Sequence, residues 1–248
     1  MISLIVPCWK DEEHAIEFAE KWANHPLIRE VIVAAVCDQS HLQQPNRKIK
    51  RCQSDRPSRG LQLNLGAKIA SGEVLLFHHV DSILTEEHLQ SLVNSMHDPD
   101  LVGGAFYRKF DGRHPHLRWL EKFERWHCRA FGTIYGDQSV FVRRNHFRSI
   151  GGFEPIPLME DVELSGRLRR SGQIKLLDPP METSALKQTE RGSWTVTMRN
   201  LLFLILFRCG IPAERVLVLR IMRGWGIEGL WRIWQSERVL STRIWVTA

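Results

Sequence analysis

The stretch RGLQLNLGAKIASGEVLLFHHVDS, residues 59–82, decides the fold. Apolar residues recur at helical spacing from about Leu61 to Ala70, and Gly72 then interrupts the pattern. The apolar run Val74–Phe77 is bounded by polar residues, as in a short buried strand, and Asp81 follows it. A helix that leads into a buried strand is typical of an α/β domain, in which Asp81 would lie at the carboxyl end of a parallel strand.

The segments on both sides of this stretch extend the same alternation. Residues 3–7 and 30–36 are short, β-branched apolar runs that predict strands, and residues 12–25 between them have helical spacing. A further helix is expected at 85–96. This order predicts a mostly parallel sheet with helices on both faces and ligands at the carboxyl ends of its strands.

The pattern is less regular after residue 102. We expect strands at 103–110 and 137–144, and helices at 116–132 and 160–172. The helix at 116–132 has basic and aromatic residues, but its spacing favours packing over nucleic-acid binding. Its core stripe is predicted to be Leu117, Leu120, Phe123 and Trp126.

The composition is that of an ordinary folded protein. The 248 residues are 43% apolar and 25% charged, with a net charge of +6, which excludes disordered and collagen-like classes and gives no support to a nucleic-acid binder. The five cysteines are odd in number and widely spaced, which favours a reducing, cytoplasmic compartment. The N-terminal MISLIVPCWKDEE is expected to form a strand and not a targeting signal.

The C-terminal part differs from the rest in charge. Residues 201–248 contain seven arginines and three glutamates, together with four tryptophans. We therefore divide the chain into a main domain, 1–200, and a basic, Trp-rich helical extension, 201–248. The longest apolar run, Leu201–Phe207, is too short to span a membrane. The extension would either pack on the main domain or lie at the inner face of the membrane as a peripheral contact.

Three groups of residues are suited to chemistry. Asp81 with His79 could bind a hard divalent cation, although an Asp after a strand is more often a turn former. Arg59 in the loop before a helix suits a phosphate, or is simply part of a solvated basic loop. Glu160 and Asp161 open a helix, where they either complement its dipole or supply a general base.

Taken together and in order, these segments resemble a family 2 glycosyltransferase with the nucleotide-sugar-binding GT-A fold. The resemblance covers about residues 2–215 and is carried by SLIVPCWKDEE, EVIVAAV, residues 59–82 and GDQSVFVRRNHFRSIGGFEPIPLMEDVELSGRLRRSG. More narrowly, RGLQLN, FHHVDS, YGDQSVFV and PLMEDVELSGRLRR resemble the subgroup labelled arsenosugar-biosynthesis glycosyltransferases.

The resemblance implies a hexosyltransferase-type enzyme that moves a sugar from a nucleoside diphosphate donor to a hydroxyl of a small-molecule or lipid-linked acceptor, with inversion and with Mn²⁺ or Mg²⁺. Asp161 would be the catalytic base, with Glu160 beside it. Asp81 would bind the metal and the donor, and His79 stands where relatives carry the first acid of a D-x-D element. The implied donor-binding residues also include Pro7 and Arg59, and the acceptor loop would be Gly136, Asp137 and Gln138.

The sequence departs from the family pattern at the second strand. Relatives carry an Asp there for the nucleobase and ribose, whereas Ala35 occupies that position and Asp38 follows three residues later as the proposed substitute. Ala35 and His79 both stand where relatives carry an acid. The alternative to an active enzyme is therefore a non-catalytic protein that binds nucleotide sugars or a membrane surface. A nucleotidyltransferase is disfavoured because the first strand is not followed by a G-G-x-G-T-R-L-like loop.

Overall fold

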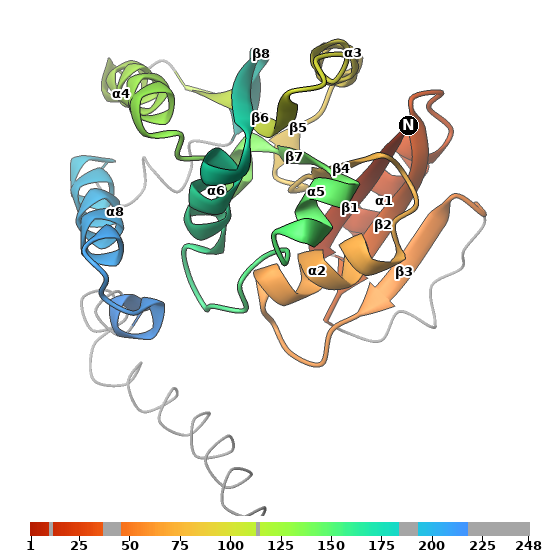
Figure 1. Cartoon of the computed structure of the whole chain (residues 1–248), viewed down its shortest axis with the longest axis horizontal. Helices are drawn as coiled ribbons and strands as arrows, with labels where there is room; N and C mark the ends of the chain where they lie inside the picture. Colours follow the sequence, from red (N-terminus) through yellow and green to blue (C-terminus); the bar gives the residue numbers. More distant parts are fainter. Residues whose placement is uncertain (10–11, 37–45, 113–114, 184–192, 218–248) are drawn as a thin grey trace, which may run out of the picture.

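The computed structural model describes residues 1–9, 12–36, 46–112, 115–183 and 193–217 and confirms the α/β prediction (Figure 1). The N-terminal half alternates strands and helices. Its elements are β1 (Ile2–Cys8), α1 (Glu12–Ala23), β2 (Ile28–Ala35), β3 (Ile49–Gln53), α2 (Arg59–Ile69) and β4 (Val74–Phe77). β1 pairs in parallel with β2 and β4, and β2 pairs in parallel with β3.

The helices cover both faces of this parallel part because successive side chains of a strand point to opposite faces. Leu4 in β1 belongs to the apolar cluster that includes Ala15 and Ala19 of α1. Its neighbour Ile5 packs instead in the cluster that includes Leu63 and Ala67 of α2. Both faces of β1 are therefore buried, which explains why it is apolar along its length.

The second half extends the sheet through an antiparallel strand. Its elements are β5 (Ser82–Ile83), α3 (Glu86–Ser95), β6 (Leu101–Phe110), α4 (Pro115–Phe131), η1 (Gly136–Gln138), β7 (Val140–Arg143), α5 (Arg144–Ser149), α6 (Glu160–Ser171), β8 (Gln173–Thr183) and α8 (Ser193–Arg208). The order is β3-β2-β1-β4-β7-β6-β8-β5. β7 runs antiparallel to both β4 and β6, and Val140 at its start pairs with Phe77 at the end of β4. This register brings η1 to the edge of the sheet where β4 ends.

Two expectations about single elements need correction, and two strands were missed. The strand expected at 137–144 is β7, four residues long, and its first part is the 3₁₀ turn η1. β3 and β8 were not predicted. In α4, Leu117 and Leu120 are buried, but Trp126 is 58% exposed, so its place in the predicted core stripe was wrong.

The end of the described chain is helical, as expected. α8 contacts α4 through a hydrogen bond between Thr197 Oγ1 and His116 Nε2, 3.2 Å apart. The proposed division at residue 200 falls within α8 and stays a prediction. Residues 218–248, with the four tryptophans of the extension, lie outside the described residues. Within the described part of the chain, no helix is both long and apolar enough to cross a bilayer.

Candidate active site

Strand ends and the start of α2 form one side of the candidate site. Pro7 and Cys8 end β1, and the Gln62 side chain of α2 donates hydrogen bonds to the carbonyls of Cys8, at 2.8 Å, and Ala34, at 2.7 Å. Gln62 thereby fixes the first turn of α2 against the carboxyl ends of β1 and β2. Ala35, where the sequence resemblance leads us to expect a nucleobase-binding acid, is buried at the end of β2. Asp38, the proposed substitute, lies outside the described residues.

His79 and Asp81 follow β4 at the same edge. Nδ1 of His79 lies 3.4 Å from Oδ2 of Asp81, and the two side chains are 36% and 49% exposed. They can therefore face a common ligand from the protein surface. Ser82 Oγ donates a 3.3 Å hydrogen bond to the carbonyl of Asp137 in η1, which places the predicted metal-binding and acceptor-binding segments side by side.

The buried His78 holds the turn that carries these two residues. Its ring stacks on Phe18 with centroids 4.9 Å apart, and its nitrogens contact Ser139 Oγ at 2.7 Å and the Ser82 carbonyl at 3.1 Å. Burial lowers the pKa of His78 to about 3, so the imidazole is neutral near pH 7. Its role is to shape the turn.

Asp161 and Glu160 stand at the first turn of α6, across the site from β4. Met159 before them has a positive φ of 65°, which turns the chain sharply into the helix. Oδ2 of Asp161 accepts a 2.6 Å hydrogen bond from the backbone N–H of Gly136. This bond joins the predicted catalytic base directly to the predicted acceptor loop.

Glu160 is more buried than its neighbour and pairs with Arg59. Its side chain is 9% exposed, and Oε1 lies 3.6 Å from Nε of Arg59. Burial and the nearby Asp161 carboxylate raise the pKa of Glu160, while Arg59 opposes that shift. A methyl group on Gly136 would overlap the Arg59 guanidinium, so this arginine reaches across to η1.

The loop before α6 is held by two side chains. Asn64 of α2 donates to the Phe153 carbonyl at 2.8 Å and accepts from the Phe153 N–H at 2.9 Å. Arg167 donates to the carbonyls of Ile150, at 2.5 Å, and Gly152, at 2.6 Å. These bonds fix where α6 begins, and thus where Asp161 stands.

A buried network of ion pairs, which the sequence analysis missed, contacts η1 through Asp137. Arg108 of β6 pairs with both Glu124 of α4 and Asp137. Burial alone would lower the pKa of Arg108, but the two carboxylates raise it, so the guanidinium stays charged. The only signal in the sequence was the charged pair Arg108 and Lys109 inside a strand that is otherwise mostly apolar.

The described residues also limit what Gln138 can do. Its side chain is buried, its Oε1 accepts a 2.8 Å hydrogen bond from the Tyr135 N–H, and its Nε2 lies 3.8 Å from Cys128 Sγ. Gln138 therefore shapes the loop from inside. Asp137 differs, because its Oδ1 is buried and has no hydrogen-bond partner in the described structure, although Oδ2 is paired with Arg108. A ligand hydroxyl could donate to that oxygen.

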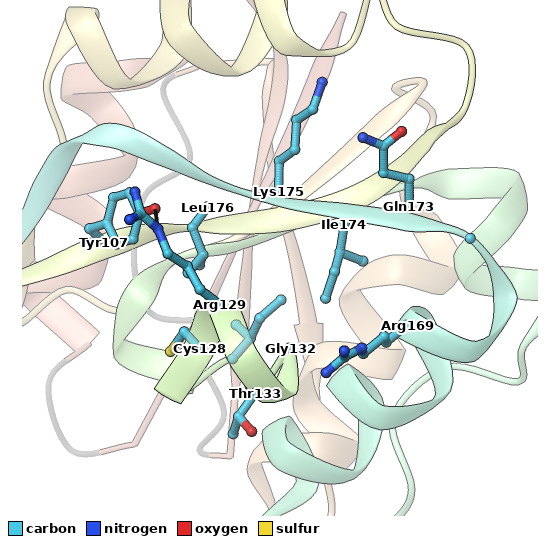
Figure 2. A pocket seen from close by; sticks show the side chains of 12 residues that line it. Tyr107, Cys128, Arg129, Gly132, Thr133, Arg169, Gln173, Ile174, Lys175 and Leu176 are labelled. Carbon is cyan, nitrogen blue, oxygen red and sulfur yellow. Dashed lines mark hydrogen bonds between the residues drawn. The ribbon is translucent and has the colours of Figure 1, made fainter. Parts of the chain in front are cut away.

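A cavity of the described residues lies away from these carboxylates. It has a volume of about 420 Å³ and lies between β8, the end of α6 and the end of α4 (Figure 2). Tyr107, Arg129 and Arg169 line it, and Arg129 Nε donates a 2.8 Å hydrogen bond to the Tyr107 hydroxyl. Arg169 belongs to the last turn of α6, whereas Asp161 belongs to the first. The cavity is thus separate from the carboxylate cluster.

Comparisons with known proteins bear on the family and the fold of the chain. The model of a family described as Glycosyl transferase family 2 matches residues 30–150. No curated protein sequence is significantly similar to the chain.

Solved structures match the fold of the chain. The crystal structure of S. aureus TarS 1-349 has a TM-score of 0.58 and 18% identity, and the match covers 83% of this chain and 65% of that one. The mannosyltransferase PcManGT from Pyrobaculum calidifontis, solved with GDP-Man and Mn²⁺, has a TM-score of 0.60 and 14% identity, with coverage of 99% and 83%. TarS 1-349 with UDP-GlcNAc matches with a TM-score of 0.57 at 18% identity, covering 74% and 58%.

The chain therefore has the GT-A fold of these glycosyltransferases and spans less than two thirds of the TarS structures. At these identities the likeness shows the fold alone. The narrower resemblance to arsenosugar-biosynthesis enzymes stays a prediction.

Proposed function

We propose that the chain is a family 2 glycosyltransferase that moves a hexosyl group from a nucleoside diphosphate donor to an acceptor hydroxyl. The observation that carries this proposal is the juxtaposition of three segments far apart in sequence. Ser82, next to Asp81, donates a hydrogen bond to the carbonyl of Asp137, and the backbone N–H of Gly136 donates one to the side chain of Asp161. A donor-side carboxylate and a candidate base thus flank one loop at the ligand-binding edge of the sheet.

Asp161 is suited to the role of general base. In the proposed reaction the acceptor oxygen attacks the anomeric carbon while the bond from that carbon to the diphosphate oxygen breaks. Asp161 takes the proton of the attacking hydroxyl, and the nucleoside diphosphate leaves with the electron pair of the broken bond. One direct displacement inverts the anomeric configuration.

Glu160 has a different role in this account. Its side chain is buried and pairs with Arg59, so we assign it the support of the arginine and assign the proton to the less buried Asp161. Arg59 is the first residue of α2, where backbone N–H groups and a guanidinium both favour phosphate oxygens. We assign the donor diphosphate to this helix start, beside Pro7.

The residues present fit a divalent cation that is shared with the donor. The described residues contain no cluster of three or more His, Cys, Asp or Glu side chains that could hold a metal alone. Mg²⁺ and related ions, however, are often bound through one or two carboxylates plus substrate phosphates. Asp81 and His79 would hold Mn²⁺ or Mg²⁺ in this way, and the ion would supply charge neutralisation for the leaving diphosphate.

The ligands of two similar solved structures suggest the class of the donor but do not identify its nucleobase. TarS 1-349 was solved with UDP-GlcNAc and PcManGT with GDP-Man, and both ligands are nucleoside diphosphate hexoses. We propose a donor of this class, a small-molecule or lipid-linked acceptor, and a cytoplasmic location. Ala35 and His79 favour the second candidate, a binder of nucleotide sugars without transferase activity.

A thermal-shift panel tests the donor site, and an assay of donor turnover then separates the two candidates. Nucleoside diphosphates and their hexose conjugates are added to the native chain and to Asp81→Ala, each with and without Mn²⁺. A ligand at about 100 times its Kd stabilises the fold by about 2.7 kcal/mol. A metal-dependent shift for one base that Asp81→Ala abolishes supports the donor site. Flat curves for every ligand would refute it, and a shift without turnover would favour the non-catalytic binder.

A further inference from the structure

We propose that an outward face formed by α4 and α8 binds the surface of an anionic membrane. The two helices lie together on the side of the molecule away from β3 (Figure 1). Besides the bond between His116 and Thr197, the Arg208 guanidinium lies 5.5 Å from the ring centre of Phe131. We call this surface the α4–α8 face.

Aromatic side chains on α4 form a continuous and partly exposed row. Trp119 stacks on Phe123 at 5.3 Å between ring centroids, Phe123 lies 6.0 Å from Trp126, and Trp126 lies 5.9 Å from Phe131. Trp119, Trp126 and Phe131 are 46%, 58% and 46% exposed. Tryptophan at such exposure is costly in water but favourable at a membrane interface, where its apolar ring and its N–H are both accommodated.

α8 also exposes apolar side chains. This 16-residue helix buries Phe203 and Leu204 but exposes Met198, Leu202 and Ile205, which share its opposite side. From Leu201 to Phe207 the helix is apolar around its circumference, and such a segment is normally surrounded by apolar material. At ~1.5 Å per residue, α8 is about 24 Å long, shorter than the hydrocarbon core of a bilayer. It can lie on a membrane but not cross it.

Basic side chains flank the aromatic row. Arg118, Lys122 and Arg125 each precede an aromatic residue of α4 by one position, which places the basic stripe about 100° around the helix from the rings. Glu121 and Asp178 pair with Arg118 and Arg125. In the part of the chain that the structure describes, no acidic side chain lies within ion-pair distance of Lys122; Arg129 has none either, although it donates to the Tyr107 hydroxyl at the cavity of Figure 2. Rings beside uncompensated cations are the pattern of an interfacial helix on anionic lipid.

Charge also argues against other occupants of this face. In a two-fold dimer the same patch meets itself, so the basic stripes of two copies would lie opposite one another. Residues 218–248 carry five arginines and two glutamates, a charge of 5 − 2 = +3, so they offer no net negative charge to complement this stripe. An anionic lipid surface complements both the rings and the cations. This surface differs from the contact predicted from the Trp-rich extension, because it is built largely on α4.

Flotation with lipid vesicles tests the proposal on the full chain. Vesicles of phosphatidylcholine are compared with vesicles that also contain phosphatidylglycerol. Trp126→Asp and Lys122→Glu remove a ring and a charge from the α4–α8 face. The matched controls are Ile69→Asp and Lys68→Glu at the exposed end of α2. Circular dichroism confirms that all four variants are folded.

We expect the native chain and both controls to float only with the anionic vesicles. Each lost positive charge near an anionic surface weakens partitioning about fivefold, so reversal at Lys122 should weaken it about 25-fold. Flotation of Trp126→Asp and Lys122→Glu as complete as that of the native chain would assign any membrane binding to other residues and overturn the proposal. Failure of the native chain to float with anionic vesicles would also overturn the proposal. So would light scattering that shows a dimer of the native chain and a monomer of Trp126→Asp, because the face would then join two copies of the chain. None of these readouts depends on transferase activity.

Discussion

Replacing Arg108 by Met should destabilise the protein strongly and in a pH-dependent way. The Arg108 and Glu124 side chains are 11% and 12% exposed, so the substitution strands the Glu124 carboxylate in the interior. Breaking one partner of a buried ion pair costs about 3–5 kcal/mol. Asp137 is 33% exposed and can recover water contacts, so we assign most of this loss to Glu124.

The sign of the pH effect follows from Glu124. Burial already raises the pKa of Glu124, and Arg108 opposes that shift. Without Arg108 the pKa rises further, so stability is retained at low pH, where Glu124 is protonated, and is lost as the pH rises through that pKa. Arg108→Met should therefore be closer to the native chain at pH 5.5 than at pH 8.

Urea unfolding followed by circular dichroism measures both effects, with Arg108→Met/Glu124→Gln as the control. The double variant removes both charges and should recover at least half of the lost stability at pH 8. The double variant should still transfer sugar slowly, because Asp137 and the acceptor loop have lost their ion pair with Arg108. A loss below about 1 kcal/mol in the single variant, or equal stability of the single and double variants at both pH values, would refute the network.

Three further substitutions test other parts of the account. Asp161→Asn keeps an oxygen that accepts the hydrogen bond from the Gly136 N–H, but the amide cannot take a proton. We expect kcat to fall about 10²–10⁴-fold while the Tm is unchanged. An unchanged kcat would rule out Asp161 as the base. Gly136→Ala should displace the Arg59 guanidinium and weaken donor binding in calorimetry, and unchanged affinity would contradict the assignment of Arg59. Burial would raise the pKa of Glu30, but hydrogen bonds from Lys50, Ser3 and Ser71 lower it from 4.5 to about 2, so its stabilising contribution is complete above pH 4.5 and is lost as the pH falls toward 2. Glu30→Gln should thus cost about 3 kcal/mol in urea unfolding at pH 7 and little near pH 2; an equal cost at both would contradict this linkage.

The sequence predicted the parts of the fold that have a strong local signal. β1, β2 and β4 are buried on both faces and therefore consist of continuous apolar runs, which are visible without a structure. β3 and β8 were missed because their residues alternate less clearly and their exposure is mixed. The exposed Trp126 was missed for a related reason, since helical spacing identifies an apolar stripe but not what covers it.

The candidate site also has parts that the sequence could suggest and parts that only the structure shows. Asp81, Gly136 and Asp161 could be selected from motifs in the sequence, but their juxtaposition depends on the antiparallel insertion of β7 beside β4. Neither periodicity nor spacing predicts that insertion. The Arg108 network joins β6, α4 and η1, and such long-range pairing of charges has no local signature. Sequence reasoning therefore selected candidate residues for chemistry but missed the Arg108 network that holds η1 in place.

The most direct test of the proposed activity is ³¹P NMR of nucleoside diphosphate hexoses incubated with the native chain, Mn²⁺ and an acceptor panel, with Asp161→Asn as the control. We predict that the native chain converts one donor to its nucleoside diphosphate and a product of inverted anomeric configuration, and that Asp161→Asn does so at least about 100-fold more slowly. Cleavage by both proteins at the same rate, or a donor that binds with micromolar affinity and is never cleaved with any acceptor, would contradict the account.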